Sequence, residues 1–300
     1  MADSYSIYGL KVQSQVALPV ELFPSLQLSA DVVVNLKGDY YPPAGVDDNR
    51  PFFFSVGPQE AFFYFRDLAV FTILKGSVIN IALANGEIDT GLLANTLLGT
   101  PMGIVLLQRD FLVLHASAVE ICGKVICFIG TSGVGKSTTV CSLLQAGHKL
   151  VTDDVVAIDL TNYLVSQGYP WMKIGPRVAL ELGLSSEKLS QLDRASIKKR
   201  YQIYPGSFSE GNGKLAGIYF LKWGEKTVVD VIKAKQAILD LMVHAYGFCP
   251  QKSYPAEEIK RFEQYAHLVK SVPCFNLVRS YDINQLNVLG RVIEEHTRRL

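Results

Sequence analysis

The stretch Gly130-Thr-Ser-Gly-Val-Gly135-Lys136-Ser137 decides the fold, because it satisfies the pattern G-x-x-x-x-G-K-[ST] and follows the apolar run Val125–Ile129. Glycines at these positions let the backbone approach phosphate oxygens closely and aim successive N–H groups at them. The start of a following helix adds its partial positive charge. From average residue usage, such an octamer arises by chance in a chain of this length about once in a hundred. We therefore expect a strand, a nucleotide-binding loop and a helix in succession.

This glycine loop, residues 130–137, defines the expected nucleotide contacts. Lys136 supplies a mobile positive charge for the β and γ phosphates, and the Ser137 hydroxyl is a ligand for Mg²⁺. ATP, or another nucleoside triphosphate, and Mg²⁺ are the expected cofactors. The residues expected to hold the nucleotide are Gly130, Thr131, Ser132, Gly133, Val134, Gly135, Lys136, Ser137 and Thr138.

Two aspartates follow at the end of an apolar run. Lys149–Thr152 has the pattern of a buried strand, and it leads into Asp153-Asp154, sixteen and seventeen residues after Ser137. A strand–helix–strand crossover brings the carboxyl end of this second strand beside the glycine loop. Paired carboxylates there can divide the work of phosphoryl transfer to an alcohol, one accepting the proton and one holding the Mg²⁺ shell. The plainer alternative is an ordinary Walker B strand, in which a single aspartate holds metal through water.

His115 lies fifteen residues before Gly130, in the strand candidate Phe111–Ile121. If this strand forms a hairpin with Val125–Ile129 through a turn at Gly123-Lys124, paired positions sum to about 246–247 and place His115 opposite Thr131 or Ser132. An imidazole there would contact phosphate or influence the acid–base balance of the aspartates. Most lone histidines on apolar strands are packed core residues, and a register slip of one residue would turn His115 away.

Positive charge downstream supplies further candidates. Arg177 follows a proline in an expected loop, where it would clamp phosphate oxygens in the transition state or form a surface salt bridge. The run Lys198-Lys199-Arg200 would approach an acidic substrate or the nucleotide, or would be a solvated face. Trp171 and Tyr201 are either core or substrate-stacking residues.

The rest of the chain suggests a β-rich region, 1–87, before the catalytic region, 88–300. Residues 88–109 have a helical pattern that Gly99 and Pro101 interrupt. The strands expected before it are Tyr5–Val12, Ala30–Leu36, Phe52–Val56, Ala61–Phe65, Val70–Leu74 and Val78–Ala82. The elements expected after the aspartates are strands 155–160, 163–166, 214–223 and 275–278 and helices 234–246, 256–270 and 282–299.

Composition describes a compact globular protein. Of 300 residues, 49% are hydrophobic and 19% charged, with a net charge of +1, so no general field favours nucleic acid or acidic membrane. Charged residues cut the longest apolar runs below the length of a membrane span, and the N-terminus lacks signal-peptide character. We interpret Cys122, Cys127, Cys141, Cys249 and Cys274 as core thiols in a reducing cytoplasm.

The block Leu114-His-Ala-Ser-Ala118, Gly130–Thr138, Gly147-His148 and Leu150-Val-Thr-Asp-Asp154 resembles the catalytic domain of HPr kinase/phosphorylase, with order and spacing that fit over about forty residues. The overall layout is closer to the HPr-kinase-like enzymes of lasso-peptide gene clusters, which phosphorylate a serine of the precursor peptide and carry a Pro-Arg element like Pro176-Arg177. The resemblance implies an α/β fold, in which a P-loop catalytic domain with a mixed sheet and flanking helices follows the β-rich region.

By the same resemblance, His115, Lys136, Asp153, Asp154 and Arg177 are the expected catalytic set, and Ser137 with the two aspartates the metal ligands. Three departures point away from HPr as the substrate: Ala116 stands where HPr kinases have glycine, the downstream signature of the bifunctional enzymes has no good match, and residues 1–86 differ from their N-terminal module. The expected function is therefore a Mg²⁺- and ATP-dependent serine kinase acting on a peptide or protein, with a lasso precursor as the leading acceptor. HPr kinase/phosphorylase, a small-molecule alcohol kinase, a P-loop switch ATPase and an idle nucleotide-binding module are the alternatives. HPr kinases form hexamers, so a homo-oligomer is possible.

Overall fold

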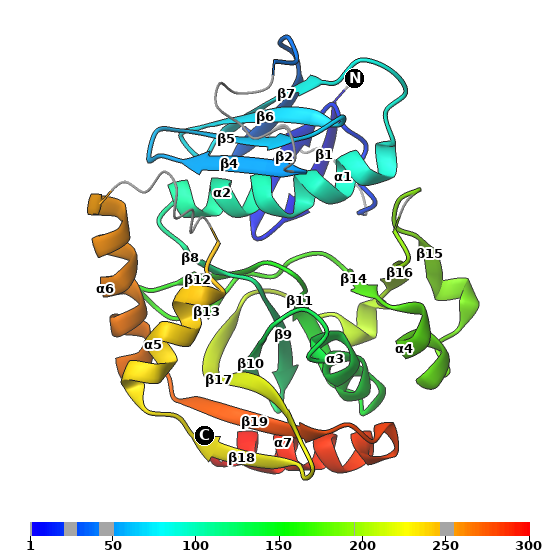
Figure 1. Ribbon diagram of the computed structural model, residues 1–300, viewed down its shortest axis with the longest axis vertical. Helices are drawn as coiled ribbons and strands as arrows, with labels where there is room; N and C mark the ends of the chain where they lie inside the picture. Colours follow the sequence, from blue (N-terminus) through cyan, green and yellow to red (C-terminus); the bar gives the residue numbers. More distant parts are fainter. Residues whose placement is uncertain (1, 21–28, 42–50, 195, 247–254) are drawn as a thin grey trace.

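The computed structural model describes residues 2–20, 29–41, 51–194, 196–246 and 255–300. Figure 1 shows a small sheet lying on two helices, α1 and α2, with a larger sheet and its flanking helices on their other side. We call the two sheets the N-terminal sheet and the central sheet. Both mix parallel and antiparallel neighbours. The predicted mixed α/β class is confirmed in this coarse form.

The N-terminal sheet has the strand order β1-β2-β3-β7-β6-β5-β4. Side chains along β6 alternate between buried and half-buried, as expected where one sheet face covers a core. The run predicted as one strand, Tyr5–Val12, is in fact a hairpin, because Tyr8 and Gly9 both take positive φ values (55° and 73°) and turn the chain. The strands are β1 (Asp3–Ile7), β2 (Leu10–Ser14), β3 (Val32–Leu36), β4 (Phe52–Val56), β5 (Glu60–Phe65), β6 (Ala69–Leu74) and β7 (Val78–Leu83).

Helices α1 (Thr90–Leu98) and α2 (Thr100–Gln108) cover the inner face of this sheet. Asp89 caps α1 by accepting a hydrogen bond from the Leu92 N–H. The predicted interruption at Gly99 and Pro101 is confirmed. Leu97 and Ile104 share a buried apolar cluster with Phe71 of the sheet. The helices thus belong structurally to the N-terminal sheet, and the division of the chain after residue 87 stays a prediction.

Among the described residues, one segment, Thr90–Gln108, is long and apolar enough to cross a membrane. The prediction that no run reaches that length is therefore wrong here. An 18-residue stretch of this segment is 67% buried inside the fold, as expected for core helices of a folded domain.

The central sheet has the order β11-β9-β10-β17-β13-β12-β8, with β19 beside β17 and β18 beside β19. β9 pairs antiparallel with both β10 and β11, so those two strands run in the same direction and end at the same edge. The glycine loop follows β10 and the two aspartates follow β11, which places both at this edge. The strands are β8 (Leu112–Leu114), β9 (Ala116–Ile121), β10 (Lys124–Ile129), β11 (Lys149–Thr152), β12 (Val156–Asp159), β13 (Leu164–Val165), β17 (Gly213–Gly224), β18 (Val228–Val231) and β19 (Cys274–Ser280).

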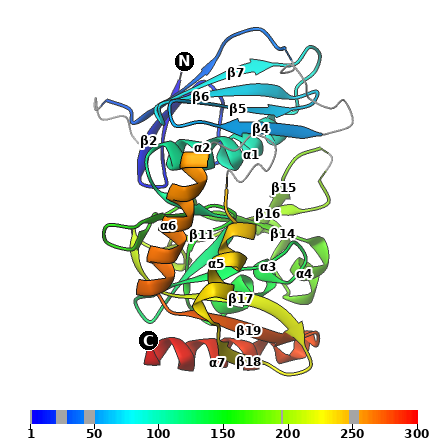
Figure 2. The same ribbon diagram turned by 60° about the vertical axis from the view of Figure 1, so that its left-hand side comes forward.

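Helices cover both faces of the central sheet (Figure 2). On one face, Leu143 of α3 and Ile293 of α7 pack on Phe128. On the other, Leu241 of α5 and Leu268 of α6 pack on Ile218. The bounds are α3 (Lys136–Gln145), α5 (Ala234–Val243), α6 (Pro255–Ser271) and α7 (Leu286–Arg299). The predicted helix from Asp282 starts later, because the short 3₁₀ turn η3 (Ile283–Gln285) precedes α7.

A small antiparallel sheet flanks the glycine-loop edge, in the order β14-β16-β15. Its elements and their neighbours are β14 (Trp171–Ile174), α4 (Pro176–Glu181), η1 (Ser186–Lys188), β15 (Leu189–Gln191), β16 (Lys199–Gln202) and η2 (Pro205–Ser207). The prediction that Arg177 lies in a loop is wrong: Pro176 occupies the first turn of α4, where its missing N–H costs nothing, and Arg177 follows it inside the helix.

The predicted hairpin register is also wrong. Ile129 pairs with Ala116, whereas the predicted register pairs it with Ser117 or Ala118. The turn lies at Cys122-Gly123, where both residues have positive φ, one position before the predicted one. The predicted strand 111–121 is broken at His115, which lies between β8 and β9.

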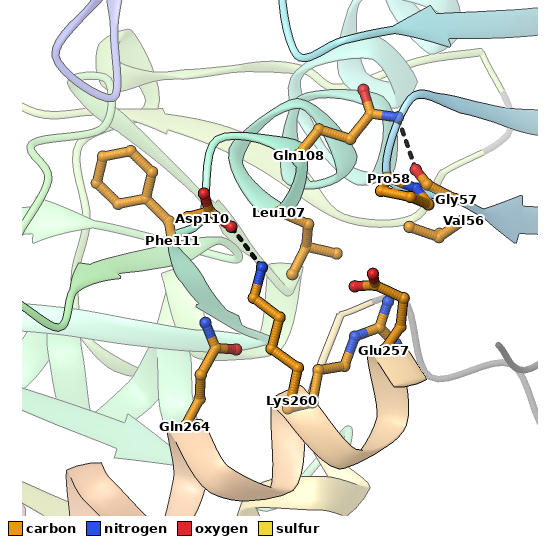
Figure 3. Close-up of a pocket in the computed structure, with 11 residues that line it drawn as sticks. Val56, Gly57, Pro58, Leu107, Gln108, Asp110, Phe111, Glu257, Lys260 and Gln264 are labelled. Carbon is orange, nitrogen blue, oxygen red and sulfur yellow. Dashed lines mark hydrogen bonds and ion pairs between the residues drawn. The ribbon is translucent and has the colours of Figure 1, made fainter. Parts of the chain in front are cut away.

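The contact of α6 with α2 joins the two halves of the molecule (Figure 3). Lys260 of α6 forms a 2.6 Å ion pair with Asp110, and the Gln108 side-chain amide donates to the Gly57 carbonyl at 2.9 Å. The cavity that these residues line has a volume of about 50 Å³, which leaves room for little more than water. This contact therefore has a structural role: it holds α6 against the end of α2.

The cysteine prediction holds for Cys127, Cys141 and Cys274, which are buried as free thiols. Burial raises the pKa of Cys274 to about 12. The prediction of a core thiol is wrong for Cys122, which is exposed in the β9–β10 turn. Cys249 lies outside the described residues.

Candidate functional site

A cavity of about 280 Å³ lies at the edge of the central sheet where β10 and β11 end. It contains nearly all of the predicted site. Its walls are His115, Ser117, Thr131, Ser132, Gly133, Gly135, Lys136, Ser137, Thr138, Asp153, Asp154, Lys173, Gly175, Val178 and Lys198. Of the predicted residues, Gly130, Val134 and Arg177 do not line it. Segments that are far apart in the sequence, from His115 to Lys198, therefore converge on one cavity.

The glycine loop has the backbone geometry that the sequence pattern requires. Gly133 and Gly135 have φ values of 84° and 97°, which residues other than glycine rarely adopt. A Cβ on Gly135 would collide with the Arg279 guanidinium, and one on Gly130 would lie 2.7 Å from Val134 Cγ1. Val134 itself is buried and anchors the loop to the core. Gly130 and Val134 therefore set the shape of the loop, and their role in nucleotide binding stays a prediction.

Arg279 of β19 supports this loop from behind. It is 3% exposed, and its Nη1 donates to the Gly135 carbonyl at 2.9 Å and to Thr139 Oγ1 at 3.3 Å. Its guanidinium lies 4.5 Å from the ring of Trp223, and burial lowers its pKa. Arg279 was not predicted, since nothing in the sequence connects an arginine 144 positions away with Gly135.

Lys136 and Ser137 begin α3 at the floor of the cavity. The Lys136 ammonium donates to the carbonyls of Gly130 and Thr131, so the side chain folds back over the loop. Burial lowers its pKa, opposed by the negative charges of Asp153 and Asp154. The Ser137 hydroxyl donates to the Lys173 carbonyl at 3.1 Å.

Asp153 is buried, with 6% of its surface exposed. Its Oδ1 accepts a hydrogen bond from the Ser117 hydroxyl at 2.6 Å, and its Oδ2 accepts one from the Lys173 backbone N–H at 3.1 Å. Burial, and then the neighbouring charge of Asp154, raise its pKa above the ordinary aspartate value, although both hydrogen bonds oppose the shift.

Asp154 has the opposite environment. Its Oδ2 lies 2.7 Å from Lys173 Nζ, and its Oδ1 lies 3.1 Å from His115 Nδ1. Burial alone would raise its pKa, but the Lys173 charge and the His115 hydrogen bond outweigh burial and hold the pKa well below the ordinary value. Its backbone is left-handed, with φ of 73°, a strained conformation that places both carboxylates at one edge.

His115 is fixed at the gap between β8 and β9. Its backbone N–H donates to the His244 carbonyl at 2.8 Å. Its Nδ1 lies 3.1 Å from both the backbone carbonyl and Oδ1 of Asp154, and both of these atoms are acceptors. Nδ1 therefore carries a proton, and Nε2 is the nitrogen left for the cavity. Tyr246 completes the arrangement by donating its hydroxyl to the same Asp154 carbonyl at 3.2 Å.

Arg177 lies apart from this cluster. Its side chain is 89% exposed and forms a 2.6 Å ion pair with Glu181, one turn along α4. This geometry corresponds to the surface salt bridge that the sequence left open as an alternative. In contrast, Lys198 of the basic run does line the cavity.

Sequence reasoning missed Lys173 and Ser117. Lys173 is the one charged residue in the apolar strand β14, and a lysine is rarely buried unless it is paired, which was the available signal. Ser117 belongs to the quoted Leu114–Ala118 block, two residues after His115. Both residues line the cavity.

The residues present fit Mg²⁺. No group of three or more His, Cys, Asp or Glu side chains that would hold a metal by itself occurs in the described part of the chain. Mg²⁺ usually needs only one or two carboxylates, with the remaining positions filled by water and substrate phosphates. Ser137, Asp153 and Asp154 line one cavity and provide that oxygen set.

Comparison with known proteins finds relatives of the segment that contains the glycine loop and the two aspartates. Residues 109–171 match the model of the HPr Serine kinase C-terminal domain. The chain is 38% identical to the HPr kinase/phosphorylase of Treponema pallidum (strain Nichols) over 95 residues, covering 31% of this chain and 29% of that protein. It is 39% identical to the HPr kinase/phosphorylase of Clostridium beijerinckii over 72 residues, covering 24% of each.

These matches span less than a third of the length of those two relatives. A solved structure, that of the Hpr(Ser) kinase/phosphatase from Coxiella burnetii, aligns over 62% of this chain and 91% of that chain, with a TM-score of 0.33 and 11% identity. The similarity to the HPr Serine kinase C-terminal domain covers the glycine-loop segment, residues 109–171.

Proposed function

We propose that this protein is a Mg²⁺- and ATP-dependent kinase that transfers the γ-phosphoryl group to a serine hydroxyl of a peptide, with a lasso precursor peptide as the leading acceptor. One observation carries the proposal: the buried carboxylate of Asp153 lines the same cavity as Lys136 and the glycine loop. A switch ATPase needs a metal-holding aspartate there, whereas transfer to an alcohol also needs a proton acceptor.

Asp153 is the proton acceptor in this proposal. Burial raises the pKa of Asp153 above the ordinary aspartate value, so Asp153 accepts a proton more readily than Asp154, whose pKa is held low by Lys173 and His115. As the serine oxygen bonds to the γ phosphorus, its proton passes to Asp153, and the bond from that phosphorus to the β–γ bridging oxygen breaks to release ADP. Ser117, which donates to Asp153 Oδ1, orients the carboxylate.

Asp154 has a different role in the proposed reaction, because Lys173 and His115 hold its carboxylate in place as an anion. It would hold Mg²⁺ together with Ser137, directly or through water, and the metal would neutralise charge on the phosphates. Lys136 adds its charge at the β and γ phosphates, and His115 presents Nε2 to the cavity. Catalysis is then mainly positioning and charge neutralisation.

HPr itself is the second candidate acceptor. The relatives that match residues around the glycine loop are named HPr kinase/phosphorylase, and this is the observation that favours it. The three sequence departures noted above weigh against it. In either case we place the protein in the cytoplasm, acting on a peptide or protein rather than on nucleic acid or membrane.

Intact-mass analysis tests the proposal. A lasso precursor peptide and HPr are each incubated with the protein and Mg·ATP. We expect the peptide alone to gain one phosphoryl group, and to remain unmodified with Asp153→Asn. A phosphate on HPr would restore the HPr kinase interpretation. Free phosphate with neither acceptor modified would contradict the proposal and favour a switch ATPase or small-molecule kinase.

A further inference from the structure

A second cavity, of about 270 Å³, lies between the N-terminal sheet and the catalytic edge. Aromatic side chains of β4 and β5 and one leucine of α1 form its apolar wall. We call this cavity the phenylalanine cleft. Its apolar wall consists of Phe52, Phe54, Phe63, Phe65 and Leu92. The proposed chemistry uses none of these residues.

The cleft continues from the proposed catalytic centre. Asp154 and Lys173 line this second cavity as well as the one that holds the glycine loop. The ion pair between them, 2.7 Å long, therefore forms the partition between the two spaces. A molecule in the cleft would meet Asp154 directly, next to the cavity that holds the glycine loop, where the acceptor hydroxyl must lie for in-line transfer.

The wall has the character of a binding surface. Phe52 is 50% exposed and Phe54 and Phe65 are half-buried, so the rings keep surface that a ligand would cover. Phe63 is buried and fixes the others, with its ring 6.3 Å from that of Phe52 and 6.4 Å from that of Phe65. Half-exposed rings that a buried ring holds in place favour the binding of a large apolar side chain, since covering apolar surface contributes about 25 cal/mol per Å².

The polar groups of the cleft suit a peptide backbone. Asn95 of α1 is 6% exposed and lines the cleft, and its Nδ2 donates to the Leu192 carbonyl at 3.1 Å. Its Oδ1 has no hydrogen-bond partner among the described residues. Such a buried acceptor is costly unless a donor reaches it, and a peptide N–H is such a donor. Thr96 and Thr100 also line the cleft.

We propose, on the basis of the proposed function, that the phenylalanine cleft binds a large apolar side chain of the acceptor peptide close to the phosphorylated serine. Because the cleft meets Asp154, this side chain lies within about two residues of the serine, each residue spanning about 3.5 Å at most. The N-terminal sheet thereby selects the acceptor, and the central sheet performs the transfer.

The probe is a set of peptide pools with one central serine, in which each flanking position is fixed in turn as Phe, Leu, Gly, Asp or Lys. Label transferred from Mg·[γ-³²P]ATP is measured for each pool. We expect the Phe and Leu pools at one position to be labelled at least about tenfold faster than the Gly pool, the effect of burying one large side chain in part.

Phe54→Ala should abolish this preference, and Phe53→Ala is its matched control. Both phenylalanines are half-buried on β4, but Phe53 lies on the opposite sheet face, where its ring contacts Phe62. An unchanged preference in Phe54→Ala, an equal loss in Phe53→Ala, or no apolar preference in the wild type would overturn the proposal and leave the kinase assignment intact. Weaker ATP binding in Phe54→Ala alone would also overturn it, because the cleft would then hold the nucleotide base.

A binding measurement separates failure of the cleft from failure of the proposed function. If no pool is labelled, peptide phosphorylation fails, and N-acetyl-phenylalaninamide is titrated into the full chain by NMR. Saturable shifts that Phe54→Ala removes and Phe53→Ala keeps would support the cleft as an apolar side-chain site. Absence of binding, or equal binding by both variants, would overturn it.

Discussion

The ammonium of Lys173 lies 2.7 Å from Asp154 Oδ2, while the backbone N–H of the same residue donates to Asp153 Oδ2 at 3.1 Å. One residue of β14 thus orients two carboxylates that have opposite pKa shifts. Adjacent titratable groups whose environments separate their pKa values are typical of acid–base sites. The difference allows each aspartate to be assigned a separate part in the proposed reaction.

Replacing the Lys173 ammonium should impair transfer more than nucleotide binding. Lys173→Met leaves Asp154 beside Asp153 without its cation, so the pKa of Asp154 rises and the pair binds a proton more readily. We expect a loss of about a hundredfold in the transfer rate at neutral pH, with partial recovery in Lys173→Arg. The acidic limb of the pH–rate profile should move to higher pH.

Lys149→Met is the control for this substitution, because Lys149 forms its ion pair with the exposed Glu210 at 3.1 Å. It should leave both the rate and the pH profile unchanged. An unshifted profile in Lys173→Met would show that Lys173 does not act through the aspartates.

The two aspartates should have opposite effects on stability. The folded-state pKa of Asp153 is raised, so the carboxyl lowers stability as the pH rises above the unfolded-state pKa, and the cost is complete above the folded-state pKa. Asp153→Asn should therefore raise the Tm at pH 7–8, and this gain should vanish near pH 4 and below, where the carboxyl is protonated. Thermal unfolding across this range measures it, and a Tm lowered at neutral pH would contradict the burial argument.

Asp154→Asn should instead lower the Tm at neutral pH. The folded-state pKa of Asp154 is depressed, so its stabilising contribution is present above the unfolded-state pKa and is lost as the pH falls through the folded-state value. Removing it leaves the Lys173 ammonium without its partner. We expect a loss of about 2–3 kcal/mol, less than the 3–5 of a fully buried pair because both side chains are about one-fifth exposed.

The sequence was sufficient to predict the elements with strong local patterns. The glycine loop and the helix after Lys136 follow from the glycine spacing, and β11 follows from an apolar run. The break of β8 from β9 at His115 could not be predicted, because it depends on the backbone bond from His115 to the His244 carbonyl, 129 positions away. The contacts of Arg279 and Lys173 are likewise long-range, and no local pattern encodes them.

The contact between Gly135 and Arg279 gives a test of the loop geometry. Gly135→Ala places a methyl group in a left-handed backbone, at about 1–2 kcal/mol, and also against the guanidinium. Gly147→Ala meets the same backbone cost at φ of 92° but has open space around its Cβ. Calorimetric ATP titration should show at least about a tenfold loss for Gly135→Ala only. Equal losses in both variants would exclude a specific role for the Arg279 contact.

Arg177 should be dispensable for transfer. Its 89% exposed side chain pairs with Glu181 and does not line the cavity, so we expect Arg177→Ala to change the transfer rate by less than about twofold. Lys136→Ala should abolish nucleotide turnover under the same conditions. Steady-state assays of both variants decide this, and a large loss in Arg177→Ala would mean that α4 moves toward the nucleotide during the reaction.

The most direct test follows the γ phosphate itself. Wild-type protein and Asp153→Asn are each given Mg·[γ-³²P]ATP and pooled serine peptides, and ATP affinity is measured on the same preparations. We predict that the wild type moves label into peptide, and that Asp153→Asn binds ATP within about threefold of the wild type but transfers at least about a hundredfold more slowly. Label released by the wild type only as free phosphate, or transfer preserved in Asp153→Asn, would contradict the account.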